Sequence, residues 1–143
     1  MRRDEIARAV ITELKNISAA NGYYTEAGAN VHEWLERPLG EEETPCIIVR
    51  DPESSSNADS YTSMHILTFE IDVIISDSKV TNTMSLREHI SDVIKAFGVV
   101  CDEVIHEIGE YKGSEVIADF KGRTYASARL KFTITYPAGK WEH

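Results

Sequence analysis

The sequence is poor in basic residues and has no long apolar run. Its 143 residues include 15 Lys and Arg against 24 Asp and Glu, which gives a formal net charge of −9. Because clustered positive charge supplies most of the non-specific affinity of proteins for nucleic acid, we expect this chain to repel DNA on average. No apolar run approaches the roughly 20 residues that cross a bilayer, and the N-terminus lacks the apolar core of a signal peptide. The composition therefore predicts a protein of the cytoplasm that is not held by a membrane.

Cysteine is scarce, and the common catalytic motifs are absent. Cys46 and Cys101 lie far apart in the chain and match no paired metal-binding spacing. We therefore predict that both thiols are reduced and structural, with Cys46, which opens the apolar run CIIV, packing as a small hydrophobic side chain. The sequence contains no G-x-G-x-x-G, no G-K-[S/T] loop and no G-x-S-x-G elbow. The sequence therefore offers no motif that would support nucleotide binding or acyl transfer.

Two short segments resemble chemical sites at first. HEWLE, at His32, looks like a zinc-protease helix motif, but its fifth residue is Glu36 instead of a second histidine. The segment CDEVIHE brings Asp102, His106 and Glu107 together in sequence. A catalytic or metal site needs a third convergent group, for which the sequence supplies no motif. We therefore predict no enzyme, no catalytic residue, no metal and no cofactor, with a small ligand-binding domain or enzyme at this cluster as the less favoured alternative.

Periodic apolar residues predict two helices. The first spans residues 4–17, and its apolar stripe consists of Ile6, Val10, Leu14 and Ile17. The second spans residues 85–97, with Ser85 and Glu88 as a capping box and Gly98 as the stop signal. Its apolar face consists of Leu86, Ile90, Val93, Ile94 and Phe97.

Alternation of apolar and polar residues predicts a long strand over residues 61–76, well beyond the roughly 5–6 residues of an average strand. Its apolar positions are Tyr61, Leu67, Phe69, Ile71, Val73 and Ile75. Further strands are expected at 28–34, 46–51, 114–120 and 124–136. The polar segment 52–60 is expected to be a loop or a hairpin tip. Residues 99–111 remain ambiguous between a short helix and an irregular connection.

The order of these elements predicts a single α+β domain spanning residues 1–143. Mostly antiparallel strands form one sheet, and the two main helices pack on one of its faces to make a two-layer sandwich. The other face carries Thr, Ser, Arg, Lys and Glu and stays free for solvent or a partner. The acidic run Glu41-Glu42-Glu43 is expected to be a solvated loop. Trp34 and Trp141 are candidates for anchoring an interface. For Trp34, burial in the hydrophobic core is an equally favoured alternative.

This layout resembles the tail terminator proteins of long-tailed bacteriophages, the group of the lambda minor tail protein U. The resemblance extends from about Arg3 to Tyr136 and depends on the order and length of the elements, on PCIIV at the start of a strand and on the closing ITY. The matching segments are the helix RRDEIARAVITELKNI, the stretch VHEWLERPLGEEETPCIIVRD, the strand LTFEIDVII, the helix SLREHISDVIKAF and the strand SARLKFTITY. Neck and tail-completion proteins of phages share related α+β folds and are the nearest alternative.

The resemblance implies a structural role. Members of the family form a hexameric ring at the head-proximal end of the tail tube, where they stop tube growth and present a surface to the head, while DNA passes through the ring without being held. The implied partners are further copies of the chain, the tail tube protein and the head–tail connector. The implied location is the virion tail, assembled in the bacterial cytoplasm. From the residues, we predict subunit contacts at Arg50, Asp51, Glu53, Asp59, Arg129 and Lys131.

Overall fold

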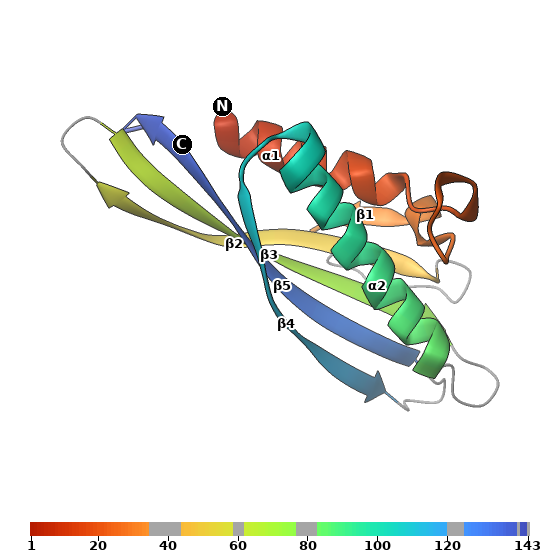
Figure 1. The fold of residues 1–143 in the computed structure, drawn as a ribbon. Coiled ribbons are helices and arrows are strands. Elements are labelled where there is room, and N and C mark those ends of the chain that lie inside the picture. Colours follow the sequence, from red (N-terminus) through yellow and green to blue (C-terminus); the bar gives the residue numbers. More distant parts are fainter. Residues whose placement is uncertain (35–43, 59–61, 77–82, 120–124, 140, 143) are drawn as a thin grey trace.

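In the part of the chain that the structure describes, two α-helices cover one face of a five-stranded sheet (Figure 1). The computed structural model describes residues 1–34, 44–58, 62–76, 83–119, 125–139 and 141–142. The helices are α1 (Arg2–Lys15) and α2 (Thr83–Val99), and the strands are β1 (Val31–Glu33), β2 (Cys46–Ala58), β3 (Thr62–Ser76), β4 (Ile108–Asp119) and β5 (Tyr125–Gly139). The strand order is β1-β2-β3-β5-β4, with a parallel β1–β2 pair and antiparallel pairing elsewhere. The predicted α+β sandwich with a mostly antiparallel sheet is confirmed.

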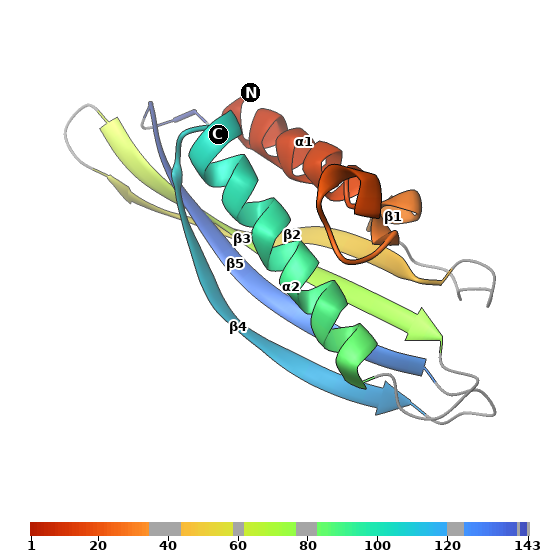
Figure 2. The same ribbon diagram turned by 45° about the vertical axis from the view of Figure 1, so that its right-hand side comes forward.

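The hydrophobic core lies between the two helices and the covered face of the sheet (Figure 2). Strand alternation turns the odd-numbered apolar residues of β3 toward the helices, where Leu67, Phe69, Ile71 and Val73 are fully buried. The ring of Phe97 on α2 stacks on Phe132 of β5, with the two centroids 4.1 Å apart. The predicted apolar residues Ile6, Val10 and Leu14 of α1 are likewise buried, and so is Ile17, which lies beyond the end of the helix at Lys15.

A buried carboxylate ties the loop after α1 to α2. Asp92, only 1% exposed, accepts hydrogen bonds from the backbone N–H groups of Tyr24 and Thr25 at 3.0 and 2.8 Å. The hydroxyl of Thr25 donates a third bond to the same carboxylate at 2.7 Å. Since a buried charge is tolerated only when it is well hydrogen-bonded, this cluster fixes the loop firmly beside the second helix.

Strand β2 is much longer than its apolar residues predict. We expected a strand over residues 46–51 and a loop over 52–60, and this expectation was wrong for the described part of the segment. After a bulge between Arg50 and Glu53, the polar residues up to Ala58 continue to pair with β3. The reason is that backbone ladder bonds do not require apolar side chains, and the long β3 offers its edge along its whole length.

Helix α2 begins earlier and ends later than its sequence signals predict. It starts at Thr83, so Ser85 lies inside the helix, where its backbone carbonyl is 2.7 Å from Nδ1 of His89; the predicted capping box is wrong. Gly98 also lies inside the helix, which continues into a π-helical turn, Val100–Val104. The turn is favoured because Val100 and Cys101 are buried in the core. Strand β4 then starts at Ile108, earlier than the predicted residue 114.

Candidate functional site

The open face of the sheet, which points away from the helices, carries a ladder of paired charges across β2, β3 and β5. Arg50 Nη1 donates to Asp72 Oδ2 at 2.7 Å, and Arg129 Nε donates to Asp72 Oδ1 at 2.8 Å. Arg129 and Lys131 also lie 3.8 and 3.9 Å from the carboxylate oxygens of Glu70. The register causes this arrangement, because Glu70 is directly opposite both Arg50 and Lys131. The ladder therefore links three neighbouring strands by charge.

Asp72 is the centre of the ladder. Burial alone would raise the pKa of its carboxyl group, but the hydrogen bonds and positive charges of Arg129 and Arg50 outweigh burial and lower the pKa below its ordinary value. The same contact raises the pKa of Arg129. Both oxygens of Asp72 are occupied by guanidinium groups of the same chain. Arg50 and Arg129 are thus already engaged within the subunit.

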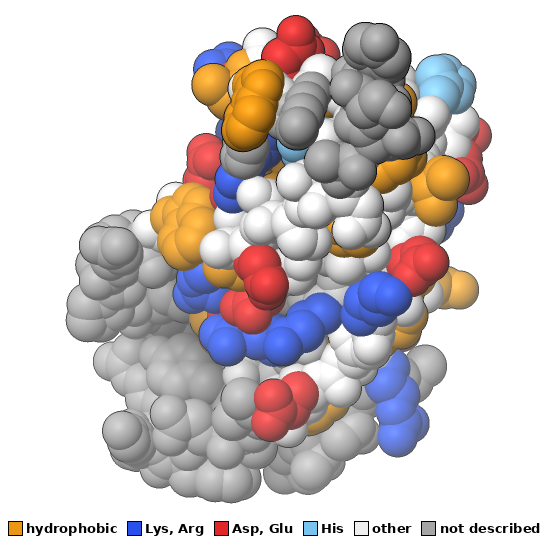
Figure 3. Space-filling view, turned by 90° about the vertical axis from the view of Figure 1, so that its left-hand side faces the viewer, with side chains coloured by type: hydrophobic (Ala, Val, Ile, Leu, Met, Phe, Trp, Pro, Cys, Tyr) orange, Lys and Arg blue, Asp and Glu red, His pale blue; other side chains and the backbone are white. Residues whose placement is uncertain are grey.

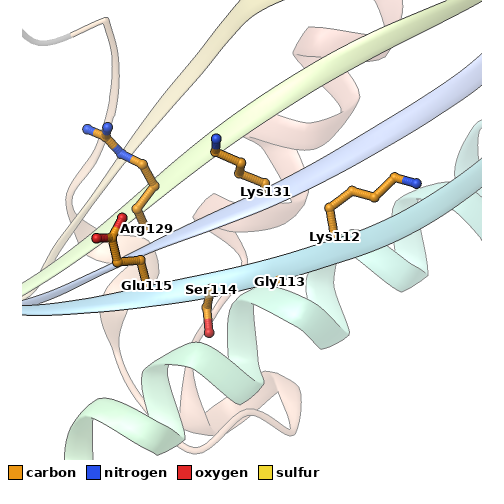
Figure 4. A pocket seen from close by; sticks show the side chains of 6 residues that line it. All are labelled: Lys112, Gly113, Ser114, Glu115, Arg129 and Lys131. Atoms are coloured by element: carbon orange, nitrogen blue, oxygen red, sulfur yellow. The ribbon is translucent and has the colours of Figure 1, made fainter.

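A shallow hollow of about 240 Å³ lies beside the ladder, where β4 carries a bulge (Figure 4). The register of β4 on β5 shifts between Tyr111 and Gly113, and Gly113 has a φ of 128°, a conformation that favours glycine. The hollow is lined by Lys112, Gly113, Ser114, Glu115, Arg129 and Lys131. Its two lysine side chains are half exposed or more, at 50% for Lys112 and 58% for Lys131. Lys112 donates a hydrogen bond to Glu110 of the same strand, which leaves the other donors of its ammonium group available. Seen from the left-hand side of Figure 1, basic side chains form a band with acidic side chains on both sides of it (Figure 3).

One end of the sheet extends beyond the helices as an arm (Figures 1 and 2). We define the arm as residues 53–58 of β2, 62–67 of β3 and 134–139 of β5, which pair with one another. Strand β1 pairs with β2 only at Ile47, Ile48 and Val49. Among the described residues, the outer edge of β2 in the arm therefore has no partner strand. Strand β4 is the last strand on the opposite side of the sheet. Among the described residues, its outer edge therefore also has no partner strand.

The base of the arm is fastened to the start of α1. Arg3 Nε donates to Asp51 Oδ2 at 3.0 Å, and its Nη2 donates to the backbone carbonyl of Asp51 at 2.8 Å. A longer contact of 3.4 Å joins Arg3 to the hydroxyl of Ser54. The indole N–H of Trp34 donates to the other oxygen of Asp51 at 3.1 Å. Asp51 therefore joins β2 to α1 and to Trp34 on the helix side of the bulge, and we call this set of contacts the junction. Trp34 itself is half exposed.

The residues of the CDEVIHE segment do not converge. Asp102 and His106 are exposed, and His106 adopts a left-handed backbone conformation with a φ of 53°. Glu107 accepts a hydrogen bond from Arg2 at 3.1 Å. Among the residues that the structure describes, no group of three or more His, Cys, Asp or Glu side chains is arranged to hold a metal ion.

Neither Cys46 nor Cys101 forms a disulfide, and both side chains are buried, as predicted. Burial, together with the charge of Asp102, raises the pKa of Cys101 to about 11, so this thiol is protonated at neutral pH. A protonated thiol is a poor nucleophile, so Cys101 is suited to packing.

The six predicted interface residues fall into four groups. Arg50, Arg129 and Lys131 belong to the ladder of the open face, and Asp51 binds α1 from the other side. Glu53 is exposed on the arm and takes part in no ion pair among the described residues. Asp59, like the Glu41-Glu42-Glu43 run, lies outside the described residues.

Sequence reasoning missed the partners of these residues. Glu70 and Asp72 occupy alternate positions of β3, and Arg129 and Lys131 occupy alternate positions of β5. That shared period of two was a usable signal for a charged ladder once the two strands were taken as neighbours. The bulge at Gly113 left no comparable signal, because glycine in a strand has several causes. Trp141, another predicted anchor, is 90% exposed.

Comparisons with known proteins leave the family open. No protein-family model matches the chain, and no curated protein sequence matches it. Of the helices described, none is both long enough and apolar enough to span a bilayer. Function must therefore be inferred from the geometry of the sheet and its arm.

Proposed function

We propose that the protein is a structural component of a phage or prophage tail: a terminator whose copies form a ring on the head-proximal end of the tail tube. The observation that carries this proposal is a single sheet with two different open edges on opposite sides, the arm part of β2 and the strand β4. A head-to-tail ring joins two unlike patches on each subunit, and two unlike edges meet that requirement.

Charge and surface chemistry support the same proposal. The net charge of −9 disfavours retention of DNA, which suits a ring through which a genome passes. The charged groups of the ladder on the open face bind one another, and the hollow beside them is shallow. Several modest contacts made at once by a ring of copies also give strong attachment to a tube end without a single tight site.

The direct test is tube assembly. Purified tail tube protein is allowed to polymerise with and without this protein, and the products are imaged by negative-stain electron microscopy. The expected result is a ring at one end of each tube and a halt in tube growth, with six copies per ring as the resemblance implies. If the protein neither caps tubes nor forms rings, the proposal fails.

The same images distinguish the nearest alternative. A neck or tail-completion protein would attach to heads that already contain a portal and would leave free tubes uncapped. A mixture of tubes and portal-containing heads therefore separates the two structural roles in one experiment. Preference for tubes is the outcome expected here.

A further inference from the structure

We infer that neighbouring copies join edge to edge, with the arm part of β2 in one copy pairing with β4 of the next and with Glu53 seated against Lys112 and Lys131 of the hollow. The inference rests on the proposed ring and adds the contact surface that would build it. Both surfaces belong to the described part of the chain, and each exposes a row of backbone groups for pairing.

Strand direction favours this pairing. The four long strands β2, β3, β5 and β4 alternate in direction across the sheet. Because β2 and β4 therefore run in opposite directions, a neighbour with the same strand orientation brings its β2 antiparallel to β4. The sheet then continues from copy to copy with antiparallel bonding and without inverting either subunit. Pairing of two β2 edges, in contrast, needs a two-fold axis and produces a closed dimer.

The register shows which residues would meet. Within one subunit Glu53 lies level with Thr68, Thr133 and Glu110, whereas the hollow lies level with Gly113 and Lys131. A displacement of a few residues along the strands brings Glu53 of one copy to the hollow of its neighbour, with residues 53–57 opposite residues 108–112. The pairing is confined to this start of β4, because β1 occupies the same edge of β2 farther along, at Ile47, Ile48 and Val49. Such a stagger is what tilted strands require when a sheet closes on itself.

Charge complementarity fits the same arrangement. Glu53 is exposed and has no ionic partner among the described residues. It lies on the open face, like Lys131, because Glu53 pairs with Thr68 and Lys131 pairs with Glu70 on the same side of β3. In a continuous sheet the open faces of two copies are contiguous. The Lys131 ammonium, whose own partner Glu70 is 3.9 Å away and beyond hydrogen-bond distance, can then donate to the carboxylate of the neighbour.

Disulfide trapping tests the register. In the staggered pairing Ser55, two residues beyond Glu53, approaches Glu110 on the neighbouring β4. We would prepare Ser55→Cys and Glu110→Cys as separate proteins, mix them and oxidise them; the native Cys46 and Cys101 are buried and do not compete. The expected product is a mixed disulfide that joins one copy of each variant. A predominant link between two Ser55→Cys copies would indicate arm-to-arm dimers and would overturn the inference.

Charge reversal tests the ion pair. Glu53→Lys is expected to weaken self-association by at least about fivefold in sedimentation experiments, because it replaces attraction by repulsion at the hollow. Lys112→Glu combined with Lys131→Glu is expected to do the same. Mixing the two reversed proteins should restore association between unlike copies. Glu103→Lys, at an exposed position on the helix side, is the matched control and should leave association unchanged.

The outcomes separate this inference from the proposed function. Rings on tube ends that are unaffected by charge reversal and give no mixed disulfide would refute edge pairing while the terminator role stands. A mixed disulfide from a protein that caps no tubes would support edge pairing and refute the role. A protein that remains monomeric at the highest attainable concentration overturns the inference.

Discussion

The helix-covered half of the sheet and the arm are built from the same three strands, yet they are held together by different forces. Under the helices, Phe69, Leu130 and Phe132 are almost completely buried, and apolar burial supplies most of the stability. In the arm, Leu67, Ile134 and Tyr136 of β3 and β5 are still buried. The β2 strand of the arm differs, because polar residues such as Ser55 and Asn57 are exposed and this strand is held chiefly by ladder bonds and by the junction at Asp51. A sheet therefore needs a core for only part of its length, and the remainder is available for contact.

The largest effect is expected in the covered half. Phe132 is 2% exposed and packs against Phe97 and Tyr111, with ring centroids 4.1 and 5.3 Å away. Phe132→Ala should lower the free energy of unfolding by about 3–5 kcal/mol, because it removes a large buried ring and leaves a cavity. Thr133→Ala, the next residue on the same strand but on the open face, should change it by less than about 1 kcal/mol. Urea denaturation of both variants measures the difference, and equal effects would contradict the contrast between the two faces.

Two glycines compare a tightly packed position with an unpacked one in the helix-covered half. A Cβ atom at Gly109 would lie 2.3 Å from Cys101 Sγ, so Gly109→Ala should destabilise the protein by about 1–3 kcal/mol through overpacking. A Cβ atom at Gly98 would meet no neighbouring atom within 4 Å, and Gly98 lies within a helix, so Gly98→Ala should stabilise the protein by about 0.5–1 kcal/mol. Thermal unfolding should shift in opposite directions for the two substitutions. A similar shift for both would show that the contact between β4 and Cys101 is looser than described.

The open face depends on charge in place of apolar burial. Asp72→Asn should cost about 1–2 kcal/mol, because Arg50 and Arg129 lose a charged acceptor. Since folding lowers the pKa of Asp72, its contribution is complete above the ordinary carboxyl pKa of 3.8 and is lost as the pH falls through the lowered value. The stability difference between the wild type and Asp72→Asn should therefore be constant near neutral pH and shrink in acid.

A nearby carboxylate provides the control for this pH dependence. Glu115 lines the hollow and is exposed, and although its charge acts on Arg129 across the strand pair, it makes no hydrogen bond or ion pair among the described residues. Glu115→Gln should change the stability at neutral pH by less than about 0.5 kcal/mol. If Glu115→Gln and Asp72→Asn proved equally destabilising, the ladder would not be the source of the effect.

How much could be predicted from the sequence depended on the force that holds each region. The helical stripe of Ile6, Val10 and Leu14 and the alternation of β3 follow burial directly, so the covered half and the α+β class were predicted correctly. The arm part of β2 was not predicted, because backbone pairing leaves no apolar pattern in a segment such as Ser54 to Asn57. The end of α2 was misplaced because Gly98 is a local stop signal, whereas the burial of Val100 and Cys101 favours continuation.

The same distinction applies to the candidate surface. Arg50, Arg129 and Lys131 were predicted as contact residues from their position on the polar face, and they do lie there. Their engagement with Asp72 and Glu70 depends on which strands are neighbours, and β5 returns beside β3 only after the intervening helix and β4. Pairing between strands that are distant in the sequence cannot be deduced from the alternation of polar and apolar residues within each strand.

A small effect on global stability is expected at the base of the arm. Arg3→Ala removes the bonds to the carboxylate and carbonyl of Asp51, and should lower global stability by only about 1 kcal/mol because the pair is partly exposed. Its local effect should be larger: without this junction, hydrogen exchange should quicken in the amides of residues 53–58, while the amides of β3 beneath the helices should be unaffected. Arg8→Ala is the control, since Arg8 forms an exposed ion pair with Asp4 on the same helix. Faster exchange throughout the sheet would mean that the arm and the covered half unfold as one unit, and the division between a packed half and a projecting arm would then be wrong.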